Sequence, residues 1–175
     1  MTSKPADTEY APYFSRYMSL VPEDDAFAVL GSQPAELSRF ASQVTPDREG
    51  YRYAAGKWTI REVFGHLIDV ERVLSYRAFC ISRGEAAPLP SFDENEYVSH
   101  SQYNDQPLRD LLSEFTAVRE TSLMFLRRAD KSAWERLGTA GDHATSVRAL
   151  AYIMAGHVRH HLAVLRDRYG ALPGD

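Results

Sequence analysis

The histidines are the residues of this sequence whose spacing could support chemistry. His157 and His161 lie four positions apart in a segment of helical periodicity, so their rings are expected one turn apart on one face. His66 lies on the apolar stripe of an earlier helical segment, between Val63 and Val70. All three imidazoles are therefore predicted to face the interior, where their ring nitrogens need polar partners.

A divalent metal ion would give the three imidazoles a common partner. Zinc and similar ions bind neutral imidazole nitrogen at ~2.0–2.1 Å, and three protein ligands leave a position open for water or substrate. Such an open position is typical of catalytic or ligand-capturing sites. Spacing alone leaves two alternatives: hydrogen-bonded core histidines, or His160 in place of His161 as the partner of His157. We favour His161 because it stays on the apolar stripe.

Acidic side chains near His66 could move a proton or orient a ligand. Asp69 follows His66 by three positions and is the candidate catalytic residue, either accepting a proton or hydrogen-bonding to a ligand imidazole. A solvated Asp69 without a role is the alternative. Glu62 is better explained by a capping box with Thr59, and Glu71 is expected to be exposed or ion-paired.

Helical segments must position these residues, because apolar periodicity is helical nearly everywhere and strand-like nowhere. Gly31 and Pro34 predict a kink or restart in the first segment, whereas Gly84 can end the second. A short turn capped by Asp130 precedes the last segment. The expected segments cover residues 10–44 with an interruption at Pro22, 59–83, 107–126 and 146–169. The predicted fold class is all-α, a four-helix bundle.

The connector between the second and third helices predicts the topology. Residues 84–106 are long enough for a crossover along the bundle, so the two helices are expected to run parallel in an up-down-down-up order. Asp93, Glu94 and Glu96 lie in this connector. They could line the mouth of the site, although the solubility of a long loop also explains them.

Length and charge limit the possible functions. The chain has 175 residues, a length that predicts one domain at 10–170, with a frayed segment at 1–9 and a tail at 171–175. Its net charge is −4. A pI near 5.9 argues against nucleic acid as a partner, and no apolar run is long enough to span a membrane. The single cysteine predicts a cytoplasmic location.

Two segments resemble the signature regions of the DinB-like (DinB/YfiT) superfamily. KWTIREVFGHLIDVE at 57–71 is similar to the family pattern W-[ST]-x-x-E-x-x-x-H-L, and SVRALAYIMAGHVRHHLAVL at 146–165 is similar to its H-x-x-x-H segment. The similarity extends from about Tyr10 to Tyr169 and includes FDENEY at 92–97. The resemblance implies a four-helix bundle with a crossover and a divalent metal held by His66, His157 and His161.

The resemblance also implies a range of activities. Some relatives are thiol-dependent transferases that use bacillithiol, mycothiol or glutathione, and others are hydrolases. The implied function is a metal-dependent S-transferase or hydrolase acting on a small molecule, with a low-molecular-weight thiol as a candidate partner and a homodimer as a candidate assembly. Zinc or nickel is the expected metal, with iron as a further option. Here Leu162, Ala163 and Val164 follow His161 where the family often has R-G-Q, which removes a polar patch beside the metal.

Two other classes of function remain open at this point. One is a non-catalytic protein that binds a metal or small molecule, such as a stress-response sensor. The other is a purely structural bundle whose histidines are hydrogen-bonded in the core.

Overall fold

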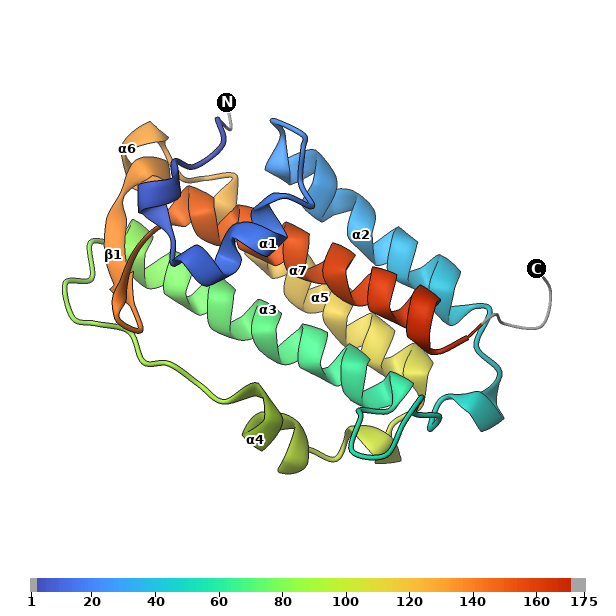
Figure 1. The fold of residues 1–175 in the computed structure, drawn as a ribbon. Helices are drawn as coiled ribbons and strands as arrows, with labels where there is room; N and C mark the ends of the chain where they lie inside the picture. The colour runs from blue at the N-terminus through green and yellow to red at the C-terminus, as the bar shows by residue number, and fades with distance from the viewer. Residues whose placement is uncertain (1–2, 171–175) are drawn as a thin grey trace.

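Four long helices lie side by side in the computed structural model, which describes residues 3–170 (Figure 1). They are α2 (Ala26–Ala41), α3 (Ile60–Ser82), α5 (Leu108–Leu126) and α7 (Val147–Arg168). The shorter elements are η1 (Asp7–Glu9), η2 (Pro12–Phe14), α1 (Ser15–Met18), η3 (Pro46–Arg48), α4 (Glu94–Ser99), η4 (Tyr103–Asp105), α6 (Lys131–Glu135), β1 (Leu137–Ala140) and β2 (His143–Ser146). The prediction of an all-α four-helix bundle is confirmed.

The order of the long helices is up-down-down-up, as the sequence predicts. In Figure 1, α2 and α7 run from left to right, whereas α3 and α5 run from right to left. The chain from 83 to 107 returns along the length of the bundle and carries α4 and η4. This crossover makes α3 and α5 parallel neighbours.

Local signals in the sequence explain where the site-bearing helices begin and end. The Thr59 side chain accepts a hydrogen bond from the Glu62 backbone N–H, and the Glu62 carboxylate accepts one from the Thr59 backbone N–H at 2.7 Å. Ser146 caps α7 by accepting a hydrogen bond from the Ala149 backbone N–H. Gly84 has a positive φ of 85°, which suits the residue that follows a helix C-terminus.

The first helical segment differs from the sequence prediction in its layout. Residues 26–41 form one continuous helix with Pro34 inside it, so the predicted restart at Gly31 or Pro34 is not observed. The helix begins at Ala26 because Asp25 caps it, accepting hydrogen bonds from two backbone N–H groups. Helix α1 is a separate turn that packs against α7 (Figure 1).

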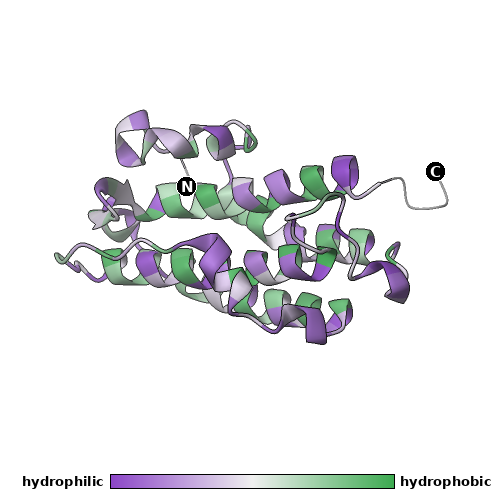
Figure 2. Cartoon of the chain, turned by 60° about the horizontal axis from the view of Figure 1, so that its bottom comes forward, coloured by the Kyte–Doolittle hydropathy of each residue, from purple (hydrophilic) through white to green (hydrophobic). Residues whose placement is uncertain are grey.

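Bands of hydrophobic and hydrophilic residues alternate along each long helix (Figure 2). This pattern is that of helices that bury one face, and the buried faces meet in a core along the bundle. None of the described helices is long and apolar enough to cross a membrane.

A two-stranded antiparallel hairpin precedes α7, which the sequence pattern does not predict. Strands β1 and β2 pair Leu137 with Ser146 and Ala140 with His143. The hairpin anchors the crossover, because the Leu89 backbone N–H donates to Thr139 and the Leu89 carbonyl accepts from Gly141, both at 2.9 Å. Strands of four residues are too short to give a clear alternation.

The N-terminal segment packs against the start of α7. Residues 3–9, which the sequence predicts to be frayed, include η1, and Glu9 is buried in an ion pair with Arg148. The predicted tail at 171–175 lies outside the described residues.

Candidate metal centre

Three imidazoles from two helices converge inside the bundle. Nε2 of His66 on α3 lies 2.9 Å from Nε2 of His157 and 3.2 Å from Nε2 of His161, both on α7. His66 and His157 are buried, and His161 is half-buried. The three residues that helical periodicity selects are therefore the three that the fold brings together.

The donor set fits a divalent ion. Two nitrogens bound to one ion at ~2.0–2.1 Å lie roughly 3 Å apart, which matches both distances from His66. Without an ion, three neutral imidazoles satisfy one another poorly here. Each Nε2 atom either donates or accepts a hydrogen bond, and Nε2 of His66 faces two others. Nδ1 of His161 is buried without a hydrogen-bond partner among residues 3–170, so this ring is tied to the site through Nε2.

Burial keeps the cluster in the protonation state that binds metal. Desolvation, together with the charge of His160, lowers the pKa of His66 to about 4. Desolvation and the neighbouring imidazoles hold the pKa values of His157 and His161 well below the usual range of histidine. The three rings are thus neutral at pH 7, and neutral imidazole is the ligand form.

His160 takes a different position from His161. Its ring packs edge-on against Tyr17 with centroids 5.6 Å apart, and it is not part of the group whose nitrogens converge. Of the two histidines that spacing offered as partners of His157, the structure brings His161 to the site.

Aromatic residues enclose the cluster on two sides. The Trp58 ring lies against His66 with centroids 4.6 Å apart, and the Tyr17 ring meets His157 edge-on at 5.5 Å. Such apolar walls limit water access and strengthen electrostatic interactions at the site.

Two glycines beside the histidines allow this close approach. A Cβ on Gly65 would lie 2.0 Å from the Tyr103 ring, and a Cβ on Gly156 would lie 2.2 Å from the Tyr17 carbonyl oxygen. Both distances are far below van der Waals contact. Glycine at these positions therefore lets η4 pack against α3 beside His66, and α1 pack against α7 beside His157.

Asp69, the catalytic candidate from the sequence, contacts the crossover. Its Oδ1 accepts a hydrogen bond from the Tyr103 hydroxyl at 2.6 Å. Burial raises the pKa of Asp69, and this hydrogen bond acts in the opposite direction. Asp69 is not among the described residues that line the cavity at His157.

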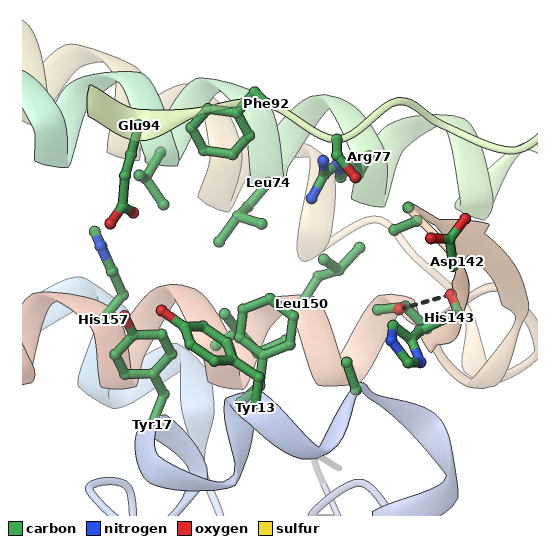
Figure 3. A pocket seen from close by; sticks show the side chains of 18 of the residues that line it. Tyr13, Tyr17, Leu74, Arg77, Phe92, Glu94, Asp142, His143, Leu150 and His157 are labelled. Atoms are coloured by element: carbon green, nitrogen blue, oxygen red, sulfur yellow. Dashed lines mark hydrogen bonds between the residues drawn. The ribbon is translucent and has the colours of Figure 1, made fainter. Parts of the chain in front are cut away.

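A cavity of about 550 Å³ reaches the cluster at His157. Its walls come from α3, α7, the N-terminal segment, the crossover and the hairpin (Figure 3). Glu94, the first residue of α4, directs its carboxylate toward the ring of His157 (Figure 3). Asp93 also lines the cavity, although its side chain caps α4. Glu96 is absent from the described lining residues.

Buried polar residues position α7 next to the site. Arg119 is fully buried and forms an ion pair with Glu71, which is also buried. Arg119 donates to Gln33 at 2.6 Å, and Gln33 donates to the carbonyl of Ala155 at 2.6 Å. This network is not predicted from the sequence, although Glu71 was expected to be exposed or ion-paired. A cation on the apolar stripe of α5 is the signal that could have revealed it.

The comparison with protein families gives one match across most of the chain. The sequence model of the DinB superfamily matches residues 30–165. These residues include all three histidines of the cluster. No curated protein sequence matches the chain.

Two solved structures share the fold. YfiT from Bacillus subtilis, described as a probable metal-dependent hydrolase with an unusual four-helix bundle topology, has a TM-score of 0.72 and 18% identity over 91% of this chain and 87% of that chain. The mycothiol-dependent maleylpyruvate isomerase has a TM-score of 0.69 and 16% identity over 89% of this chain and 63% of that chain. At these identities the likeness shows the fold.

Proposed function

Because the chain belongs to the DinB superfamily, we propose that it is a divalent-metal-dependent enzyme acting on a small molecule. His66, His157 and His161 are the proposed ligands. The observation that carries the proposal is the convergence of their Nε2 atoms, 2.9 and 3.2 Å from that of His66. The description of YfiT as a probable metal-dependent hydrolase supports it.

Zinc or nickel is the proposed metal, with iron as a further option, because three imidazoles suit each of these ions. A divalent ion bound there would act as a Lewis acid, would lower the pKa of a coordinated water to near neutrality and would hold a coordinated thiol as the thiolate. Three ligands on two adjacent helices leave the cavity side of the site open to that nucleophile.

Two carboxylates of the chain are candidates to accept the proton of the nucleophile. Glu94 has the better placement, since its carboxylate faces His157 across the cavity (Figure 3). Asp69 is the second candidate; its bond to the Tyr103 hydroxyl also holds the crossover against α3 next to His66. We propose that Glu94 accepts the proton and that Asp69 positions Tyr103.

Hydrolysis is the favoured reaction, and thiol transfer is the second candidate. The structure described as a probable hydrolase aligns over 87% of its length, whereas the mycothiol-dependent isomerase aligns over 63%. A small-molecule substrate is the proposed partner in either case, with a low-molecular-weight thiol as the co-substrate of a transferase. A cytoplasmic location and a homodimer complete the proposal.

A turnover screen of the metal-loaded protein tests this function. The panel contains carboxylic esters and amides for hydrolysis, and an electrophile with each low-molecular-weight thiol for transfer. We expect turnover that EDTA abolishes, that stoichiometric metal restores, and that Glu94→Gln lowers by 10²-fold or more, on the order of a general-base contribution.

Conservative variants separate the two carboxylates. Asp69→Asn keeps a hydrogen-bonding partner for Tyr103 and should change turnover less than Glu94→Gln does. Tight metal binding without turnover of any substrate class would contradict the enzyme and favour a non-catalytic sensor.

A further inference from the structure

The cavity that reaches His157 has a buried arginine in its wall, some way along α3 from the histidine cluster. Arg77 on α3 is buried, with 8% of its surface exposed, and it lines the cavity. Figure 3 shows Arg77 and His157 apart along the cavity, with Leu74 and Leu150 between them and the hairpin residues Asp142 and His143 beyond Arg77. The distance along α3 from His66 to Arg77 is about 16 Å, for a rise of 1.5 Å over eleven positions.

The charge of Arg77 has no acidic partner. Among residues 3–170, no carboxylate lies within 4.0 Å of its guanidinium, whereas the other buried arginine, Arg119, is paired with Glu71. Arg77 donates from Nη2 to the carbonyl of Pro90 at 2.5 Å, which orients the side chain from the crossover. Burial lowers the pKa of Arg77, as expected for a cation without a counter-charge.

Apolar side chains of α3, α7 and the crossover line the cavity between His157 and Arg77. Val70 and Leu74 of α3, Leu150 and Ile153 of α7, and Phe92 of the crossover line the cavity. Figure 3 shows Leu74 opposite Leu150, with Phe92 beside Leu74. The Phe92 ring also lies 5.7 Å from the Arg77 guanidinium carbon. An occupant that spans from His157 to Arg77 therefore contacts apolar side chains between the two.

None of the acids that line the cavity, among residues 3–170, forms an ion pair with the guanidinium. Glu94 is at the His157 end, and Asp93 caps α4. Asp142 and His143 are exposed in the hairpin, and Asp142 approaches no closer than the 4.0 Å limit of an ion pair. A single cation without an ion-pair partner suits a monoanion better than a doubly charged phosphate.

We propose that Arg77 binds the carboxylate of a substrate with an apolar or aromatic body. The guanidinium fork matches a carboxylate, and an apolar surrounding strengthens the charge-assisted hydrogen bonds. The proposal rests on the proposed function in one respect, since the substrate's reacting end would lie at the histidine cluster. The site thus selects extended, amphiphilic carboxylic acids.

Calorimetric titration of the full-length metal-loaded protein with two probes tests this site. The probes are 6-phenylhexanoate and its neutral amide, 6-phenylhexanamide. We expect the acid to bind about tenfold more tightly than the amide, as a charge-assisted bond predicts. Arg77→Gln should abolish this preference, and Arg77→Lys should retain part of it. Arg83→Gln, which removes an exposed cation from the same end of α3, should leave it unchanged.

Three results would overturn the proposal. These are equal affinities for the two probes, binding of neither probe, and an acid preference that survives in Arg77→Gln but disappears with EDTA. The last result would mean that the carboxylate binds at the metal. Circular dichroism of each variant confirms folding, and Arg77→Lys keeps the test valid where Arg77→Gln is unstable.

Metal content measured on the same samples separates this proposal from the proposed function. Bound metal without an Arg77-dependent acid preference would reject the carboxylate site alone. An Arg77-dependent preference in a protein that binds no metal would reject the metalloenzyme and keep the carboxylate site.

Discussion

Arg119 and Glu71 form a bidentate ion pair in the middle of the bundle, with Nε and Nη2 of the guanidinium each 2.8 Å from a carboxylate oxygen. At most 2% of either side chain is exposed. The pair joins α5 to α3, and Gln33 extends the network from α2 to the Ala155 carbonyl on α7. All four long helices thus meet at one polar network, two residues before His157.

Replacing Arg119 by methionine should destabilise the protein strongly. The change leaves Glu71 buried without its partner, which costs about 3–5 kcal/mol in the free energy of unfolding. The double variant Arg119→Met/Glu71→Leu should recover much of this loss, because no uncompensated charge remains. Urea unfolding measures both. Arg72→Met, which breaks the exposed pair with Glu114, is the control and should cost less than about 1 kcal/mol.

Alanine at any of the three clustered histidines should remove the metal. Two imidazoles are a weaker set than three, so His66→Ala, His157→Ala and His161→Ala should each lose most bound metal during purification. Elemental mass spectrometry of protein made without chelators or a histidine tag measures the content. His160→Ala is the matched control, since it lies on the same helix outside the cluster. Undiminished metal in the His157 variant would reject the ligand assignment.

Removing the metal should lower the melting temperature. An ion that binds the native state at a hundredfold excess over its Kd stabilises by about 2.7 kcal/mol. For a chain of this size that corresponds to a drop of about 5–10 °C on adding EDTA. Differential scanning calorimetry with and without EDTA measures the shift, and His157→Ala should show none. An unchanged wild-type melting temperature would favour a purely structural histidine cluster.

The metal-free protein should lose stability below about pH 6.5. Burial lowers the pKa of His66 to about 4, so the unfolded chain takes up a proton before the folded one does. The free energy of unfolding is highest above pH 6.5 and falls as the pH approaches 4. At pH 5, His66 alone lowers it by about 2 kcal/mol relative to its value above pH 6.5. His157 and His161 act in the same direction.

Urea unfolding in EDTA at pH 7.5 and pH 5 measures this loss. His66→Gln should reduce the dependence on pH, because it removes one of the buried imidazoles. Equal midpoints at the two pH values would mean that the imidazoles are solvated rather than buried.

Periodicity and capping predicted the parts of the site that depend on a single helix. His157 and His161 share a face because they are four residues apart, and Thr59 with Glu62 determines where the helix carrying His66 begins. The roles of Arg77 and Arg119 could not be predicted from the sequence, because their partners lie on other elements of the fold. Each interrupts an apolar stripe with a cation, which indicates an unusual environment without indicating its partner.

The placement of Glu94 shows the same limit. Its sequence position in a long connector is compatible with plain solubility, and the crossover path decides what it faces. The hairpin that anchors the crossover is held by backbone hydrogen bonds of Leu89, which leave no side-chain signature.

The two sides of the histidine cluster lie 91 positions apart in the chain. An ion shared by His66 and His157 would therefore act as a reversible cross-link that closes a loop containing the crossover, α5, α6 and the hairpin. In the chain-entropy description, closing a loop of about 100 residues costs an unfolded chain about 4.7 kcal/mol. The folded chain already holds the two helices together, so the ion binds the native state in preference to the unfolded one. Metal supply would then set how long the native protein persists, as well as whether it reacts.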